Sequence, residues 1–194
     1  MEYRIDKAQL LDILSIWNSH IKRKVCLVAC GGTALTLLDL KESTKDVDFL
    51  IPDEAEYKYL IKALEGLGYE PKTGTSWRRG KGFEFDLFVG KKIFTTELLE
   101  SSLEEGNNTL FKEFSYIYLG ILNYYDLLIS KIFRFTSVDM EDCLVLFKAK
   151  RKEIDIEKLK ERFYETSSYD VSDERNKRNF RLFLHILEKE GFNI

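Results

Sequence analysis

The chain has 194 residues, the size of one domain or of one domain with a helical appendage. Apolar residues make up 44% and charged residues 32%, which suits a globular protein, and the net charge of −3 gives no global sign of nucleic-acid binding. No apolar run approaches the roughly 20 residues that a membrane span needs, and the N-terminus lacks a signal-peptide core, so we expect a cytoplasmic protein.

The cysteines and histidines disfavour several kinds of site. Cys26, Cys30 and Cys143 form an odd set with no His beside them in the sequence, so we expect buried free thiols rather than a disulfide or a zinc site. The only two histidines, His20 and His185, lie near opposite ends of the sequence. A His-based metal site and a Ser-His-Asp triad are therefore disfavoured.

The first half of the chain alternates between helical and strand-like patterns. Asp6 is placed to cap the first helix, and Asp53 is placed to cap a clearly amphipathic one. The predicted elements are a helix ending near residue 21, a strand at 25–29, a helix at 33–40, a strand at 46–51, a helix at 54–67 and a short strand at 69–72.

The second half continues with two strands and then becomes helical. We predict a loop at 72–81, a strand at 82–89, a helix at 93–105, a turn at 106–108, a strand at 114–119, and helices at 124–135, 138–150, 156–166 and 173–190. The fold class is therefore α+β. We expect a small mixed β-sheet flanked by helices over residues 1–120, and a C-terminal helical region at 121–194 packed on this core.

The stretch from Val25 to Ile51 carries the strongest chemical signal. Its apolar strand leads directly into Gly31-Gly32-Thr33, where glycine allows a sharp turn and a close approach of ligand to backbone. The helix that follows presents unpaired N–H groups and the positive end of its dipole. We expect Gly31, Gly32 and Thr33 to bind the phosphates of a nucleotide.

Two carboxylates follow this turn. Asp46 and Asp48 lie two residues apart on a predicted strand, so both project from the same face. Adjacent carboxylates repel each other and are costly unless a cation lies between them. A phosphate-binding turn followed by a paired-carboxylate metal site favours nucleotide chemistry.

The combined motif resembles a known signature. Gly31-Gly32-Thr33, twelve further residues and then Asp46-Val47-Asp48-Phe49 are similar to the polymerase-β-like nucleotidyltransferase superfamily. Within it, residues 40–48 resemble small DUF6036-type proteins, and the chain also resembles AbiEii-type toxins. The similarity extends from about residue 25 to 148. The resemblance implies an NTP substrate, Mg²⁺ or Mn²⁺ held by Asp46 and Asp48, and transfer of a nucleoside monophosphate to an acceptor hydroxyl.

A third carboxylate completes the site in that superfamily, on a neighbouring strand. Asp86, within the sequence Phe85-Asp86-Leu87-Phe88, matches this context. The resemblance implies that Asp86 ligates metal and activates the acceptor. Glu84 would face the same side of the strand, so the choice between these two acids is open. The alternative is that Asp86 is an exposed strand residue without a catalytic role.

A second group of charged residues lies on two predicted helices. Lys131 and Arg134 are on the first, and Asp139 and Asp142 are on the second. The resemblance implies that Lys131 contacts the nucleotide's phosphates and that Arg134, Asp139 and Asp142 orient the site. Ion pairs between the two helices explain the same residues, and the two interpretations are compatible.

A basic loop precedes the strand of Asp86. Residues 72–92 hold six basic and two acidic residues, and Arg78, Arg79 and Lys81 lie close to Trp77. This loop is either a solvated segment or a patch that steers a triphosphate or an RNA backbone, with Trp77 stacked on a base.

Together, these patterns and the resemblance imply a metal-dependent nucleotidyltransferase whose acceptor is RNA, a protein or a small molecule, and we expect no membrane partner. The resemblance to toxins adds a toxin–antitoxin system, with an antitoxin-type protein as partner. The alternative is a catalytically inactive nucleotide-binding or regulatory protein of the same fold.

Overall fold

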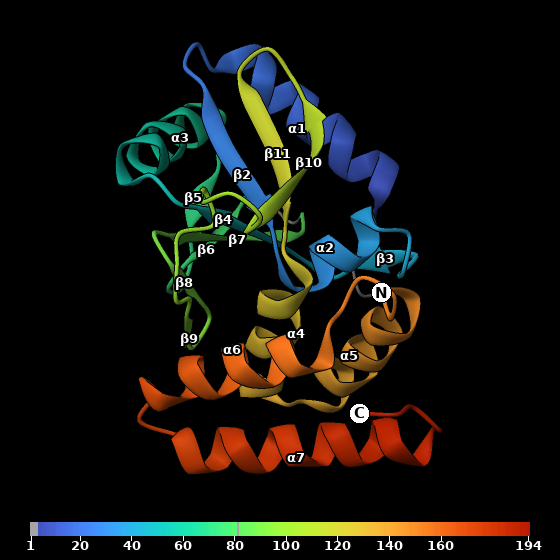
Figure 1. Ribbon diagram of the computed structural model, residues 1–194. Coiled ribbons are helices and arrows are strands. Elements are labelled where there is room, and N and C mark those ends of the chain that lie inside the picture. The colour runs from blue at the N-terminus through green and yellow to red at the C-terminus, as the bar shows by residue number, and fades with distance from the viewer. Residues whose placement is uncertain (1–3, 81) are drawn as a thin grey trace. The chain divides into compact units, whose positions relative to one another are not determined.

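The structure is a computed structural model that describes residues 4–80 and 82–194 (Figure 1). The chain divides into two compact units. The first comprises Met1–Lys92 and Glu100–Asn123, and the second comprises Ile93–Leu99 and Tyr124–Ile194. In the described residues no helix is both long and apolar enough to cross a membrane.

A seven-stranded mixed sheet is the centre of the first unit, with the strand order β10-β11-β2-β4-β7-β6-β5. Its strands are β2 (Val25–Ala29), β4 (Asp46–Ile51), β5 (Glu70–Pro71), β6 (Ser76–Arg78), β7 (Glu84–Val89), β10 (Asn108–Glu113) and β11 (Ile117–Leu122). Strand β4 runs parallel to β7 and antiparallel to β2, while β6 runs antiparallel to β7. The predicted mixed sheet is confirmed, and β4 and β7 are adjacent in it.

Two short sheets accompany the large one. Strand β1 (Ile5–Asp6) pairs with β3 (Ser43–Thr44), which ties the start of the chain to the segment that precedes β4. Strands β8 (Lys92–Ile93) and β9 (Thr96–Glu97) form the other pair.

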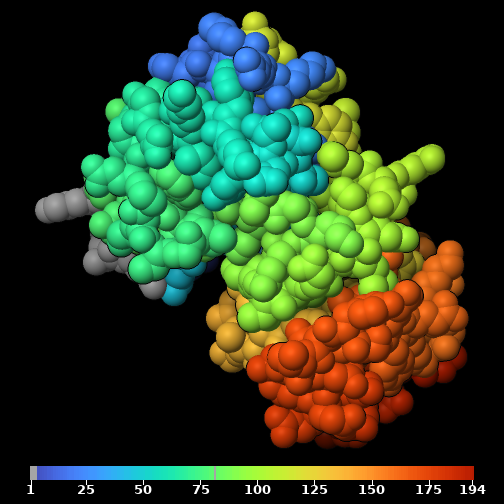
Figure 2. All heavy atoms as spheres, turned by 90° about the vertical axis from the view of Figure 1, so that its left-hand side faces the viewer, coloured from blue at the N-terminus to red at the C-terminus, as the bar shows by residue number. Residues whose placement is uncertain are grey.

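Helices α1 (Lys7–His20), α2 (Gly31–Leu37) and α3 (Glu54–Gly66) complete the first unit. Asp6 and Gln9 form a capping box at the start of α1, and the side chain of Asp53 caps α3, as their positions in the sequence predict. The outer side of α3 lies at the surface (Figure 2).

An aromatic core fills one face of the sheet. The ring of Trp17 on α1 lies 4.7 Å from that of Phe85 on β7, and both pack against Tyr69. Because side chains alternate along a strand, burying Phe85 on this face directs Glu84 and Asp86 to the other. The hydrophobic core thus determines which face of the sheet carries the acidic residues.

The second unit contains four helices, α4 (Tyr124–Arg134), α5 (Ser137–Ala149), α6 (Ile156–Ser168) and α7 (Asp173–Lys189), as the periodicity predicts. Phe163 on α6 stacks on Phe180 of α7 with ring centroids 4.0 Å apart. Arg162 on α6 binds both carboxylate oxygens of Asp126 on α4, at 2.7 and 2.8 Å.

The prediction of a helix at 93–105 is wrong. The structure has β9 and turns in this stretch instead, with Phe94 in the left-handed region at φ 52°. The ring of Phe94 covers the guanidinium of Arg134, 3.8 Å from the ring centroid, and Ile93, Thr96 and Leu98 are buried. This packing outweighs the helical pattern, because local propensity is weak beside tertiary burial.

Candidate active site

Hydrogen bonds connect the Gly31–Thr33 turn to strand β4. The main-chain N–H of Asp48 donates to the hydroxyl of Thr33 at 2.8 Å, and the N–H of Gly32 donates to the Asp48 carboxylate at 3.3 Å. Thr33 is fully buried, and its hydroxyl is also 3.5 Å from the carbonyl of Asp46. In this structure Thr33 therefore positions the strand that carries both aspartates.

Gly31 is required by this arrangement. Its φ is +56°, in the left-handed region, and a Cβ placed there would lie 2.1 Å from Oδ2 of Asp48. A Cβ at Gly32 would lie 2.7 Å from the hydroxyl of Thr44. The two glycines thus let the main chain approach Asp48 and Thr44 closely.

The register of three adjacent strands sets polar and charged side chains in two rows on one face of the sheet. Register partners share a face, as do residues two apart on one strand. The Asp46 row consists of Asp46, Glu84 and Arg78, and the Asp48 row consists of Asp48, Asp86 and Ser76. The structure thus places Asp46, Asp48 and Asp86 on one face of two neighbouring strands, although they are far apart in the sequence.

Burial differs among the three aspartates. Asp46 at the start of β4 is exposed, Asp86 is half-buried, and Asp48 is 5% exposed. Asp48 is therefore the most shielded from water, and its hydrogen bond to Gly32 compensates part of the cost of that burial.

Asp86 and Glu84 have different surroundings, which bears on the choice between them. Asp86 accepts hydrogen bonds from the hydroxyls of Ser76 and of Thr75, the latter at 3.3 Å. Glu84 binds two cations, with Lys72 at 2.7 Å and Arg78 at 3.5 Å. Asp86 is the acid paired in register with Asp48, so this geometry favours Asp86 as the third carboxylate.

Sequence reasoning missed Ser76 and Thr75 because they fall inside the segment that it assigned to a loop. Part of that segment is strand β6. The signal for it was weak, because only Trp77 of its three residues is apolar and buried.

The carboxylates supply the oxygen ligands that Mg²⁺ and Mn²⁺ prefer, so their chemistry fits the implied metal. Within 4–80 and 82–194, however, no three Asp, Glu, His or Cys side chains gather closely enough to hold an ion. The carboxylates of Asp48 and Asp86 are instead hydrogen-bonded to different neighbours, Gly32 and Ser76.

Lys131, Arg134, Asp139 and Asp142 form an ion-pair network in the second unit. The ammonium of Lys131 lies 2.7 Å from Asp142 and 3.8 Å from Asp139, while Arg134 binds Asp139 at 2.5 Å. The side chain of Lys131 is only 2% exposed. The interhelical ion pairs that the sequence allows are therefore present. Burial also raises the pKa of the neighbouring Cys143 thiol.

The basic loop divides between the two faces of β6. Trp77 is 7% exposed and paired in register with Phe85, on the aromatic face, so the idea that it stacks on a base is wrong. Arg78 is half-buried on the opposite face, Arg79 is exposed, and Lys81 lies outside the described residues.

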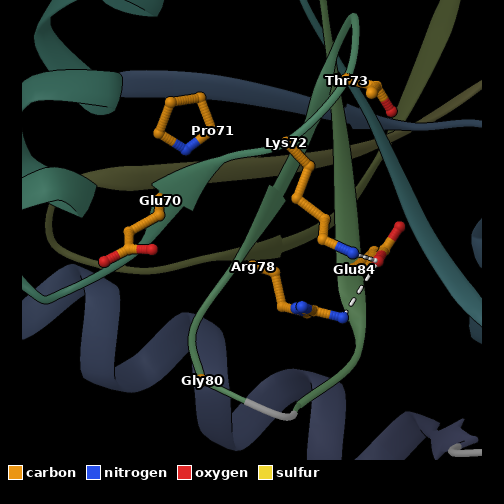
Figure 3. A pocket seen from close by; sticks show the side chains of 7 residues that line it. All are labelled: Glu70, Pro71, Lys72, Thr73, Arg78, Gly80 and Glu84. Carbon is orange, nitrogen blue, oxygen red and sulfur yellow. Dashed lines mark hydrogen bonds and ion pairs between the residues drawn. The ribbon is translucent and has the colours of Figure 1, made fainter.

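Arg78 and Glu84, both members of the Asp46 row, help to line a pocket of about 470 Å³ (Figure 3). We refer to it as the Lys72–Arg78 pocket, and its lining residues are Glu70, Pro71, Lys72, Thr73, Arg78, Gly80 and Glu84. Its volume lies within the range of small-molecule sites.

Comparison with known proteins supports both the fold and the family. The family described as "Nucleotidyltransferase of unknown function (DUF6036)" matches residues 8–190. A crystal structure of ANT(2″)-Ia in complex with adenylyl-2″-tobramycin superimposes with a TM-score of 0.57 at 14% identity, covering 84% of this chain and 98% of that chain. A solution structure of the antibiotic-resistance factor ANT(2″)-Ia gives a TM-score of 0.55 at 15% identity, with coverage of 96% and 98%.

A search of curated proteins found no match. At these identities the solved structures establish the α+β fold, with its mixed sheet and C-terminal helical region, and no more.

Proposed function

The chain belongs to the DUF6036 family of nucleotidyltransferases, and from this premise we propose that it transfers a nucleoside monophosphate from an NTP to an acceptor hydroxyl. The acceptor oxygen forms a bond to the α-phosphorus as the bond between that phosphorus and the bridging oxygen to the β-phosphate breaks. Pyrophosphate leaves, and the hydroxyl proton passes to a carboxylate.

One observation supports this proposal above the others. The strand register pairs Asp48 with Asp86 on one face of the sheet, and the Gly31 turn lies directly against Asp48. Asp46, Asp48 and Asp86 would hold Mg²⁺ or Mn²⁺, which supplies positive charge to the triphosphate and lowers the pKa of the attacking hydroxyl. The main chain at Gly31 and Gly32 would contact the phosphates, because these residues begin α2, and the first N–H groups of a helix have no partners within the helix.

Asp86 would act as the base that accepts the proton. Its carboxylate is half-buried and is held by the hydroxyls of Thr75 and Ser76, which fix its orientation without neutralising its charge. Glu84 suits this role less well, because Lys72 and Arg78 already bind it.

The likeness to a structure that contains adenylyl-2″-tobramycin suggests ATP as the first NTP to test and a hydroxyl-bearing small molecule among the acceptors. RNA and protein hydroxyls are further acceptor classes to test. A family member that has lost turnover would bind NTP and release no pyrophosphate, so binding and pyrophosphate release are measured separately.

The test is thermal denaturation with each of the four NTPs, with and without Mg²⁺, on wild type and Asp48→Asn. An NTP at 100 times its Kd stabilises by about 2.7 kcal/mol, which is a shift of several degrees for a chain of this size. We expect a Mg²⁺-dependent shift in wild type and its loss in Asp48→Asn. Asp12→Asn, at an exposed position on α1, is the matched control and should behave as wild type.

Release of pyrophosphate in the presence of candidate acceptors then distinguishes an enzyme from a binding protein. A shift that needs no Mg²⁺, or that survives in Asp48→Asn, would contradict the proposed site.

A further inference from the structure

The Lys72–Arg78 pocket lies close to Asp86, the residue that we propose as the base that accepts the hydroxyl proton. Asp86 pairs in register with Asp48 on one side and with Ser76 on the other. Ser76 is two residues before Arg78 on β6, and Glu84 is two residues before Asp86 on β7. Glu84 thus lies between Asp46 and Arg78, and Asp86 follows it on the same face of β7, between Asp48 and Ser76.

The pocket lining holds two cations and two anions, and three of these four charged side chains converge. Lys72 and Arg78 both point toward Oε1 of Glu84, whereas the carboxylate of Glu70 points away from these three side chains (Figure 3). The converging group therefore combines two cations with one anion.

The two cations also have more hydrogen-bond donors than Glu84 can use. An ammonium has three N–H donors and a guanidinium has five, and here both meet a single carboxylate oxygen. Arginine additionally presents its donors in a planar fork that matches the oxygens of a phosphate.

We propose that the Lys72–Arg78 pocket binds a phosphate group of the acceptor and thereby presents a neighbouring hydroxyl to Asp86. This inference rests on the proposed function, because it assigns the acceptor side of the same site. The acceptor class is then a nucleotide unit, either free or at the end of an RNA strand.

The spacing of the two groups agrees with that class. Arg78 and the register partner of Asp86, Ser76, are two residues apart, which is roughly 7 Å along a strand. A phosphate bound at Arg78 and a hydroxyl at Asp86 are therefore separated by about one sugar unit. A polycationic acceptor fits less well, because the converging side chains of Lys72, Arg78 and Glu84 together carry a net positive charge.

The experiment compares two variants that each lose two positive charges. Lys72→Gln/Arg78→Gln removes both cations from the pocket, and Lys62→Gln/Lys158→Gln removes two exposed cations outside its lining. Fluorescence anisotropy measures the Kd of a labelled short single-stranded RNA, and unlabelled AMP serves as the competitor. Thermal denaturation with NTP and Mg²⁺ is measured on all three proteins.

We expect the pocket variant to bind the RNA about tenfold or more weakly, since it lacks the hydrogen bonds from two charged groups, while the control variant changes far less. The slope of log Kd against log salt concentration should fall by about 0.7 for each phosphate that the variant no longer neutralises. If AMP competes with an affinity equal to that of the RNA, the acceptor is a free nucleotide. If the RNA binds and AMP does not compete, the acceptor is the end of an RNA strand.

Equal losses of affinity in the two variants, or absence of both RNA and AMP binding to wild type, would overturn the inference. The NTP shift distinguishes this failure from failure of the proposed function. If the shift is present while the pocket variant behaves like its control, the nucleotidyltransferase site stands and only the acceptor assignment falls.

Discussion

Gly31 and Asp48 leave no room between them: a methyl group on Gly31 would lie 2.1 Å from one carboxylate oxygen of Asp48. The same glycine has a φ of +56°, which strains any other residue. The turn and the carboxylate therefore depend on each other, and the position of Asp48 is set by a residue seventeen positions before it.

Gly31→Ala tests this dependence. We expect it to lower the free energy of unfolding by about 1–3 kcal/mol through backbone strain, and further because Asp48 must move. The Mg²⁺-dependent stabilisation by NTP should be lost with the movement of Asp48. Urea denaturation measures the first effect, and thermal denaturation with NTP measures the second.

Gly74→Ala is the matched control, because Gly74 has a similar φ of +61° and open space where its Cβ would go. It should show the strain cost alone and keep the NTP shift. If Gly31→Ala and Gly74→Ala behave alike, the contact with Asp48 is unimportant.

Most of the fold was predictable because the segments around the motif have unambiguous patterns. Strands β2 and β4 have the predicted bounds, because both are short and largely apolar, β2 ends just before the Gly31-Gly32 pair and β4 ends at Pro52. Strand β10 was missed because it lies at the edge of the sheet and most of its side chains are exposed, so it has little hydrophobic alternation. The next strand was predicted to begin at 114, whereas β11 is Ile117–Leu122.

The candidate site was predictable where residues are close in sequence. Spacing alone places Asp46 and Asp48 on one face of a strand. The pairing of Asp48 with Asp86 depends on β7 lying beside β4, which the resemblance implied and the residues alone did not. The hydroxyls that hold Asp86 come from Thr75 and Ser76, and their role depends on a short strand that periodicity does not detect.

Asp126 on α4 and Arg162 on α6 form an ion pair that contributes to the stability of the second unit. Asp126 is 2% exposed, and Arg162 binds both its carboxylate oxygens. Asp126→Ala leaves a guanidinium without this carboxylate, so we expect the free energy of unfolding to fall by about 3–5 kcal/mol. Chemical denaturation followed by circular dichroism measures the change.

The control is Glu157→Ala on α6, which removes an exposed ion pair with Lys160. Its cost should not exceed about 1 kcal/mol. Similar losses of stability from Asp126→Ala and Glu157→Ala would show that burial adds nothing to the Asp126 pair.

The thiols give a prediction on pH dependence. Burial, with a further contribution from Glu56, raises the pKa of Cys26 to about 12, and burial raises that of Cys143. The neutral thiol is thus favoured in the folded state, so its contribution to stability is complete below pH 9 and is lost as the pH rises toward 12. Because the thiolate is the nucleophile, both cysteines should resist iodoacetamide at about pH 8 in the folded protein.

Mass spectrometry of the alkylated protein locates each modified cysteine. Labelling in urea, where the thiols regain an ordinary pKa, supplies the control and should be fast at Cys26, Cys30 and Cys143. Rapid labelling of folded Cys26 at about pH 8 would show that its thiolate is accessible and would contradict the raised pKa.

The ion pair of Lys131 and Asp142 permits a test that separates structure from nucleotide binding. Lys131→Met alone leaves two buried carboxylates, Asp139 and Asp142, with one cation fewer, so we expect a loss of about 3–5 kcal/mol in unfolding free energy. Adding Asp142→Leu replaces the pair by apolar side chains, which should restore much of the stability, because an isolated buried charge costs more than the pair contributes.

The double variant then decides what Lys131 does beyond folding. Its ammonium lies 2.7 Å from Asp142 and its side chain is 2% exposed, so we expect a stable double variant to retain the Mg²⁺-dependent shift with NTP. A stable double variant that no longer responds to NTP would instead assign Lys131 a contact with the phosphates. Denaturation without NTP measures the structural role of Lys131, and the shift that NTP and Mg²⁺ add measures its role in nucleotide binding. Both are thus obtained from one protein.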